Sequence, residues 1–323
     1  MNFQEIKELK DRIMAGGRIT REEALRLSHT SKIDSLYYSA NQLRAKFCGH
    51  RYVLCASIKA VVGTCPEDCG WCPLSAQSTV SYTQILDVSP QKIINQAREL
   101  SGKGIKNLEI SINRNTINET ELTKLINLIN EIESQSEMRI CASLGSLSLN
   151  QLKRLKNETR ISKYHCNIES SKDFFEKNCS SIDYNNKLET LRNARKAGFD
   201  ICSGGIIGMG ESMEDRIDMA ITLRDLDVRS ISLNIHFAFS GTPMEQVPLI
   251  NSQEILTTFA LFRFINPKAQ IRFAKGRSQI RIIEKDALQA GINASLVGEL
   301  LLDIQPSEID SDIRLFEEEG FRQ

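Results

Sequence analysis

The sequence has 323 residues, and its 41 basic and 41 acidic residues cancel to a formal charge of zero. This balance leaves no basic surplus for binding nucleic acid, and no apolar run reaches the about 20 residues that a membrane span needs. The N-terminus, MNFQEIKELKDR, carries charges where a signal peptide has an apolar core, and nine cysteines without an export signal favour a reducing compartment. We therefore expect a soluble cytoplasmic protein with one large α/β domain or two smaller ones.

Helical and strand-like segments alternate along the chain. Residues 1–47 are expected to form two or three short helices, one of them opened by a capping box at Thr20. Strands are predicted over residues 52–58, 108–112, 139–143, 164–168, 201–208, 230–237, 270–274 and 294–297. Helices are predicted over residues 89–100, 118–133, from 148 onward, 185–197, 213–226, 253–265 and 279–289, with Ser89 and Ser148 as N-caps.

Eight strands that alternate with helices predict a parallel sheet closed into a (β/α)8 barrel of the TIM type. An open, doubly wound sheet is the alternative, because strand order cannot be read from the sequence. No repeat, linker or break in composition divides the barrel region. We therefore divide the chain into an N-terminal helical extension, residues 1–47, and a barrel domain, residues 48–323.

A cysteine-rich segment follows the first predicted strand. Cys65, Cys69 and Cys72 have the spacing C-x3-C-x2-C, and Trp71 directly precedes the third cysteine. A structural zinc site needs four ligands, and a four-iron cluster needs one ligand on each iron. Three thiolates on one loop therefore leave one iron free for a small molecule. The spacing resembles that of the radical S-adenosylmethionine (AdoMet) enzymes, in which the open iron chelates AdoMet.

One polar or thiol residue falls at the same inward parity on each of six successive predicted strands. A buried cysteine often serves as a small apolar side chain. Three cysteines on adjacent strands, in a chain that already has a cysteine loop, favour the interpretation as ligands. Side chains of a barrel interior near the carboxyl ends of the strands are the ones that carry chemistry. The six residues are Glu109, Cys141, Cys166, Cys202, Asn234 and Arg272.

Several blocks of the chain resemble the biotin synthase family. They are CPEDCGWCPLSAQS in the cysteine loop, LGSLS at 144–148, CSGGIIGMGE at 202–211, GTP at 241–243, and residues 271–272 leading to 276–277. The resemblance covers about residues 54–316 and implies a barrel that inserts sulfur between two unactivated carbons of dethiobiotin. It implies a [4Fe-4S] cluster that cleaves AdoMet to a 5′-deoxyadenosyl radical, a second iron–sulfur cluster that supplies sulfur, and an electron donor such as flavodoxin or ferredoxin.

The resemblance also implies roles for single residues. Cys65, Cys69 and Cys72 match the ligands of the AdoMet cluster, and Trp71 belongs with them on the cofactor side. Asn234 matches the residue that binds the ureido ring of dethiobiotin, which an amide suits because it both donates and accepts hydrogen bonds. His236 shares its parity and is a further candidate for substrate contact. The expected AdoMet contacts are Asn167 and Glu169 at the ribose, and Gly204, Ile206, Gly208 and Glu211 in a turn whose glycines let the backbone approach the cofactor.

The sulfur-donor site departs from the family pattern of three cysteines and an arginine. Cys141, Cys202 and Arg272 match, but the strand-two position is Glu109. We favour a cluster rebuilt around Cys55, Cys141, Cys166 and Cys202, since four thiolates suit a four-iron cluster and Arg272 then balances charge or adds a ligand. The alternatives are Glu109 as a hard oxygen ligand of a two-iron cluster, which soft iron–sulfide chemistry disfavours, or loss of the cluster.

Other whole-protein interpretations use the same barrel. They are a radical AdoMet mutase, a metallocofactor maturase, and a carrier of iron–sulfur clusters for another protein. Glu109 favours the mutase and the maturase. A cluster carrier binds no substrate ring, so it would not require an asparagine at position 234. A homodimer is compatible with the sequence. Cys179, in the polar segment EKNCSS, receives no role.

Overall fold

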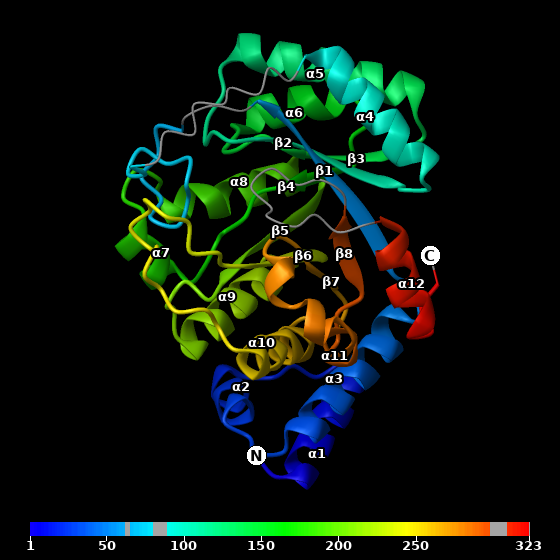
Figure 1. The fold of residues 1–323 in the computed structure, drawn as a ribbon, viewed down its shortest axis with the longest axis vertical. Coiled ribbons are helices and arrows are strands. Elements are labelled where there is room, and N and C mark those ends of the chain that lie inside the picture. The colour runs from blue at the N-terminus through cyan, green and yellow to red at the C-terminus, as the bar shows by residue number, and fades with distance from the viewer. Residues whose placement is uncertain (62–64, 80–88, 298–308, 323) are drawn as a thin grey trace.

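The computed structural model describes residues 1–61, 65–79, 89–297 and 309–322. Within these ranges eight parallel strands form a closed barrel in chain order, and β8 pairs back to β1 (Figure 1). This closure confirms the predicted barrel and excludes the open sheet. The strands are β1 (Val53–Val61), β2 (Asn107–Ile112), β3 (Arg139–Ser143), β4 (Lys163–His165), β5 (Asp200–Ile207), β6 (Ser230–Ile235), β7 (Gln270–Phe273) and β8 (Ala294–Val297).

Helices surround the barrel, and three more precede it at the lower end of the view in Figure 1. The preceding helices are α1 (Phe3–Met14), α2 (Arg21–Ser28) and α3 (Ile33–Cys48). The others are α4 (Pro90–Gly102), α5 (Glu119–Gln135), α6 (Leu149–Glu158), α7 (Lys172–Asn178), α8 (Tyr184–Lys196), α9 (Met213–Asp225), α10 (Ser252–Ile265), α11 (Glu284–Gln289) and α12 (Ile309–Glu318).

The helices begin where the sequence signals predicted. The side chains of Thr20, Ser89 and Ser148 each accept a hydrogen bond from the backbone N–H three residues later, which satisfies a donor that the helix itself leaves free. Pro90 occupies the first helical position of α4, where a missing N–H costs nothing. These three starts were readable because capping depends on neighbours in the sequence.

Some predicted bounds were wrong. The fourth strand was predicted over 164–168, but β4 ends at His165. The backbone N–H groups of Cys166 and Ile168 still donate to carbonyl oxygens of β5, before Glu169, whose φ of 69° lies in the left-handed region. The segment predicted as one helix over 279–289 begins with two 3-10 turns, Arg277–Gln279 and Arg281–Ile283, before α11. The short helix α7 was not predicted.

Helices α1–α3 pack against the outer helices α9, α10 and α11. Arg263 of α10 is fully buried and donates to the carbonyl oxygens of Gly291 (2.9 Å) and Ala269 (2.7 Å), which precede β8 and β7. It also donates to the Sγ of Cys48 at the end of α3, at 3.4 Å. This arginine therefore links the helical extension to the barrel.

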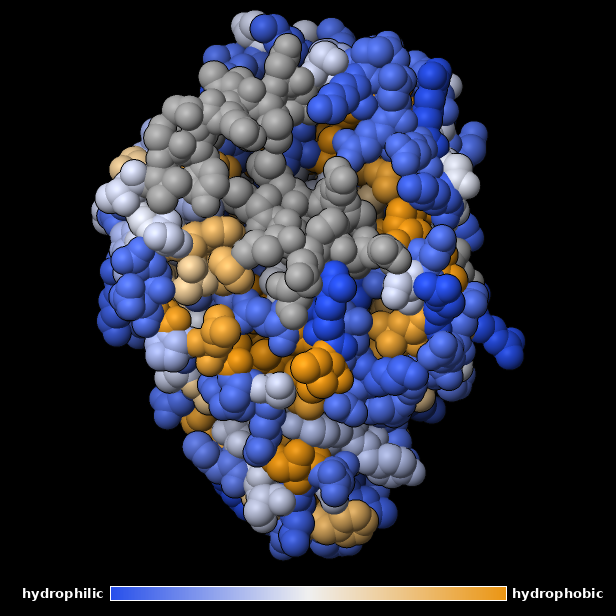
Figure 2. Space-filling view, viewed as in Figure 1, coloured by the Kyte–Doolittle hydropathy of each residue, from blue (hydrophilic) through white to orange (hydrophobic). Residues whose placement is uncertain are grey.

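The barrel has an apolar outer wall and a polar interior. Outward residues such as Leu108, Ile140 and Ile231 are buried beneath the helices. The surface in Figure 2 is mostly hydrophilic, and its apolar residues form separate patches. Within the described ranges, none of the helices combines the length and the apolarity that crossing a bilayer requires.

Candidate active site

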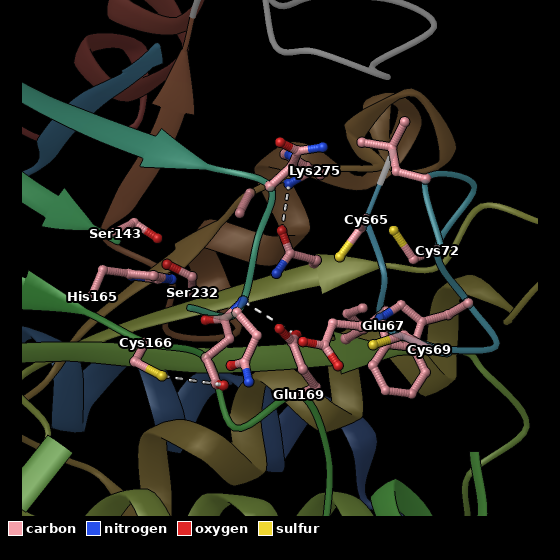
Figure 3. Close-up of a pocket in the computed structure, with 18 of the residues that line it drawn as sticks. Cys65, Glu67, Cys69, Cys72, Ser143, His165, Cys166, Glu169, Ser232 and Lys275 are labelled. Carbon is pink, nitrogen blue, oxygen red and sulfur yellow. Dashed lines mark hydrogen bonds between the residues drawn. The ribbon is translucent and has the colours of Figure 1, made fainter. Parts of the chain in front are cut away.

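A cavity of about 360 Å³ lies at the carboxyl ends of the strands, a size typical of small-molecule sites. In Figure 3 the three loop cysteines lie on one side of it, and Ser143, His165 and Ser232 lie opposite. The cavity therefore separates the cysteine loop from the inner barrel wall. Its lining includes Lys59, Cys65, Cys69, Trp71, Cys72, Glu109, Cys166, Asn167, Glu169, Lys187, Ile206, Asn234, His236 and Lys275.

The cysteine loop is fastened to the end of α7. The N–H of Gly70 donates to the carbonyl of Asn178 at 2.9 Å, and the ring of Trp71 packs on that of Phe175 with centroids 5.7 Å apart. The Asp68 carboxylate accepts hydrogen bonds from the backbone N–H groups of Ser180 (2.9 Å) and Ser181 (3.0 Å). Trp71 thus supports the loop from behind as well as lining the cavity.

Replacing Asp68 with alanine is expected to loosen this attachment without removing a thiol. The loop would lose the charge-assisted hydrogen bonds from the N–H groups of Ser180 and Ser181 and from the Ser180 hydroxyl, which hold its cysteines in position. We expect a fall in iron retained by the anaerobically reconstituted protein, and faster amide hydrogen exchange in residues 178–181. Glu67→Ala, a change of the preceding acidic residue, is the matched control. Equal iron content in both variants would contradict the expectation.

Cys179, to which the sequence analysis assigned no role, lies against the cysteine loop. Its Sγ is 3.3 Å from the Sγ of Cys69, and its side chain is buried. The hydrogen bond between these thiols raises the pKa of Cys69 and lowers the pKa of Cys179. The two cysteines are 110 residues apart in the chain, so no local pattern could have paired them.

The expected AdoMet residues Asn167 and Glu169 lie together on the cavity wall. The Asn167 Nδ2 donates to Glu169 Oε2 at 3.3 Å, and the Asn167 Oδ1 is buried without a hydrogen-bond partner among the described residues. Lys187, which the sequence reasoning missed, donates to the carbonyl of Asn167 at 3.2 Å. Burial alone would lower the pKa of Lys187, but its electrostatic interactions with Cys166 and Glu169 raise it.

Of the expected AdoMet turn, Ile206 lines the cavity, whereas Gly204, Gly208 and Glu211 lie behind it. A Cβ at Gly204 would lie 1.9 Å from the carbonyl oxygen of Ser232 on β6. Gly208 has a φ of 87°, and a Cβ there would meet the side chain of Ile250 at 2.8 Å. These glycines therefore allow close packing of protein against protein, and their contact with the cofactor stays a prediction.

Asn234 faces the cavity from β6. Its Nδ2 donates to the carbonyl of Gly205 at 3.0 Å, and its Oδ1 accepts from the N–H of Lys275 at 3.1 Å. An amide has a second N–H and a second lone pair, so this side chain can still donate to and accept from a ligand. His236 also lines the cavity, and its Nε2 has no partner among the described residues.

Inside the barrel, side chains from four strands meet. The Nδ1 of His165 lies 3.1 Å from the Sγ of Cys202 and 3.6 Å from Oε2 of Glu109. The Cys141 thiol hydrogen-bonds to Cys202, and that bond, together with the charges of Arg272 and His165, holds the pKa of Cys202 well below its usual range. Burial would lower the pKa of His165, but Cys202 and Glu109 raise it to about 9.

Arg272 and Cys55 are also buried inside the barrel. An Nη2 of Arg272 points to Cys202 Sγ at 3.8 Å and bonds to Ser230, and the Arg272 Nε is buried with no partner among the described residues. The Cys55 thiol is buried, and burial raises its pKa to about 11. The sequence therefore correctly placed Glu109, Cys55, Cys141, Cys202 and Arg272 on the inner face.

Cys166 does not join this group, so the inward position predicted for its side chain is wrong. The inward residue that pairs in register with Cys202 is His165, and Cys166 follows it beyond the end of β4. The Cys166 thiol lies 4.0 Å from the carbonyl of Asn167, and its charged neighbours are Lys187 and Glu169. Because successive side chains alternate, the shift of one residue sends this thiol to a different part of the cavity wall.

The donor sets suit iron–sulfur clusters better than a single ion. Three loop thiols with buried positive and amide groups across the cavity suit a cluster with one open iron and a zwitterionic ligand such as AdoMet. At the inner site the unpaired Arg272 Nε lacks an acceptor, which a cluster sulfide would supply. In the described part of the chain, no three His, Cys, Asp or Glu side chains converge closely enough for one metal ion, but a cluster spreads its ligands over several irons.

Comparison with known proteins identifies two family models along the chain. The model for the radical SAM superfamily matches residues 60–223, and the model for the biotin and thiamin synthesis associated domain matches residues 230–322. The first match ends within α9 and the second begins at the start of β6, whereas the barrel includes strands from both. The two models therefore divide one barrel, with the end of β1 and β2–β5 in the first and β6–β8 in the second.

Curated relatives match almost the whole chain. A biotin synthase of Clostridium botulinum (strain Hall) is 39% identical over 318 residues, which are 98% of this chain and 98% of the relative. A biotin synthase of Parabacteroides distasonis is 38% identical over 321 residues, which are 98% and 96% of the two chains. Insertions or losses of whole elements are therefore not expected between them.

Solved structures support the same fold. A methylornithine synthase superposes with a TM-score of 0.81 at 18% identity, covering 97% of this chain and 96% of that chain. The FeFe-hydrogenase maturase HydG of Carboxydothermus hydrogenoformans superposes with a TM-score of 0.82 at 17% identity, covering 98% and 79%. At these identities the likeness concerns the barrel alone.

Proposed function

The chain belongs to the biotin synthase family of the radical SAM superfamily, and from this membership we propose that it inserts sulfur into dethiobiotin to give biotin. The observation that carries the proposal is the arrangement of thiols on two sides of one cavity. The loop cysteines stand at its mouth, and Cys141 and Cys202 lie in the barrel interior behind Glu109 and His165. A substrate between them would have a radical source on one side and a sulfur source on the other.

At the mouth of the cavity, Cys65, Cys69 and Cys72 would hold a [4Fe-4S] cluster and leave one iron for AdoMet. When bound, the cluster and AdoMet supply the 5′-deoxyadenosyl radical that abstracts hydrogen from the substrate. Asn167 and Glu169 are suited to the ribose hydroxyls, and Ile206 to the apolar face of the adenine. Lys187 brings a buried positive charge to the same wall, where the AdoMet carboxylate would be stabilised.

In the interior, Cys141, Cys202 and Arg272 would hold the auxiliary iron–sulfur cluster, with Cys55 close to them. Support comes from the thiol contact between Cys141 and Cys202 and from the guanidinium beside Cys202. A positively charged side chain at this position offsets the negative charge that a thiolate-bound cluster places inside the protein. Whether the cluster has two or four irons follows from its iron content.

Dethiobiotin should stimulate AdoMet cleavage and give biotin in an anaerobic single-turnover assay. Asn234→Ala should weaken its binding by about 1–3 kcal/mol, because the ureido group loses hydrogen bonds inside the cavity. Asn234→Asp is the second variant to measure. Its carboxylate can still accept from the N–H of Lys275 but lacks the N–H donor of the amide. Binding that is unchanged in both variants would remove Asn234 from the substrate site.

A different outcome would favour another radical AdoMet enzyme. If dethiobiotin neither binds nor stimulates cleavage, a mutase or a metallocofactor maturase takes the place of the proposed function, because Glu109 stands where the family has a thiol. A cluster carrier would show cluster transfer to another protein and no response to dethiobiotin. We also propose a cytoplasmic location, a donor such as flavodoxin or ferredoxin, and a helical extension ending at residue 47.

A further inference from the structure

Resting on the proposed function, we propose that His165 is a ligand of the auxiliary iron–sulfur cluster and that Glu109 positions its imidazole. The strand-two thiol of the family is absent from this chain, and the structure brings the ring of His165 to Cys202 at 3.1 Å. The ligands of the auxiliary cluster would then be Cys141, Cys202 and His165. Arg272 and Cys55 would lie next to these ligands.

The strand order of the barrel places Glu109 and the proposed ligands in the barrel interior. Glu109, Cys141, His165 and Cys202 lie on the four consecutive strands β2–β5. Glu109 and His165 approach each other across β3, and the thiols of Cys141 and Cys202 meet across β4. Contacts between strands that are not neighbours are possible only on the inner face of a closed barrel, so all four side chains point to one space.

Glu109 is placed to orient the ring rather than to bind iron. Its Oε1 accepts a hydrogen bond from Ser57 Oγ at 3.1 Å, and its Oε2 faces the imidazole at 3.6 Å. The nitrogen that Glu109 faces is Nδ1, the same nitrogen that approaches Cys202. Histidine ligands are commonly held by a carboxylate at one ring nitrogen and bind through the other, so Nε2 would bind iron. A carboxylate oxygen is also a harder donor than an iron–sulfide core prefers.

Imidazole is a suitable replacement for the lost thiolate. Histidine replaces cysteine on one iron of Rieske-type clusters and raises their reduction potential. Here the imidazole of His165 on β4 lies beside the thiol of Cys202 on β5. The Nη2 of Arg272 on β7 approaches the same sulfur at 3.8 Å. Cys166, the thiol that the sequence favoured, points instead toward Lys187 and Glu169.

The direct test is pulsed EPR of the reduced, reconstituted full chain, labelled with ¹⁵N-histidine and free of AdoMet. We expect a strong histidine nitrogen coupling to the auxiliary cluster. The coupling should persist in His236→Gln and vanish in His165→Cys, which supplies a thiolate instead and should lower the reduction potential. His165→Ala should lose the iron and sulfide of the second cluster, whereas Cys166→Ser should keep both and the coupling.

The outcomes separate the inference from the function on which it rests. A second cluster without histidine coupling in the wild-type chain overturns the ligand assignment and leaves sulfur insertion standing. Coupling that survives in His165→Cys assigns the ligand to another histidine and also overturns it. A wild-type chain that assembles four irons and no more removes the auxiliary cluster itself, and the proposed function fails with the inference.

Discussion

Replacing Cys65, Cys69 or Cys72 with alanine is expected to reduce reductive cleavage of AdoMet to background. The three thiols lie on one loop that lines the cavity, and the open coordination position is needed for AdoMet. A variant with two thiolates leaves a second iron without its protein ligand, so the cluster is lost or cannot hold AdoMet in place. The measurement is 5′-deoxyadenosine formed per chain after anaerobic reconstitution and reduction, beside the iron content of each variant.

Two other cysteine variants make this test specific. Cys48→Ser removes a thiol at the end of α3, where it contacts Arg263 and the carbonyl of Ala269 far from the loop, and should leave cleavage intact. Cys179→Ser removes the thiol nearest to Cys69. If Cys179 replaced a loop cysteine as a ligand, this variant would lose cleavage and one of the three alanine variants would retain it.

Replacing Glu211 with alanine is expected to destabilise the fold by about 3–5 kcal/mol, because it leaves a buried arginine without its main partner. The Glu211 carboxylate accepts from the N–H groups of Gly208 (2.7 Å) and Met209 (2.6 Å) and from Nε of Arg216 (2.5 Å). The side chains of Glu211 and Arg216 are only 1% and 3% exposed. The measurement is the free energy of unfolding in urea, taken on cluster-free protein.

The matched control is Glu214→Ala at the start of α9. That side chain is 65% exposed and lies 3.8 Å from Arg21, so its loss should change stability by no more than about 1 kcal/mol. A Glu211→Ala protein with unchanged stability and weakened AdoMet binding would contradict the structural role. Glu211 would then contact the cofactor, as the family resemblance implied.

The chemistry of the loop could be predicted from the sequence because it depends on local spacing. Three cysteines within eight residues have to lie near one another in any fold, so their use as cluster ligands needs no tertiary information. The barrel was also predictable, since period-2 and helical segments alternate along the chain and the caps at Thr20, Ser89 and Ser148 mark their borders.

The inner site depended on the register of short strands, which the sequence does not reveal. The alternation of side chains placed Glu109, Cys141, Cys202 and Arg272 correctly on the inner face, because each lies within a described strand, β2, β3, β5 or β7. It failed on strand four, where β4 has three residues and ends at His165. A shift of one residue exchanges the two faces of a strand, so His165 and not Cys166 turns toward Cys202.

By itself the sequence determined the class of the protein: a barrel with a three-cysteine loop for an open iron, in a chain whose blocks follow the biotin synthase order. The tertiary structure alone decided which partners each side chain meets. Cys179 approaches Cys69 across 110 residues of chain, Glu211 pairs with the buried Arg216, and His165 lies beside Cys202. Local spacing and periodicity are properties of neighbours in the chain, whereas these contacts arise where the closed barrel brings distant segments together.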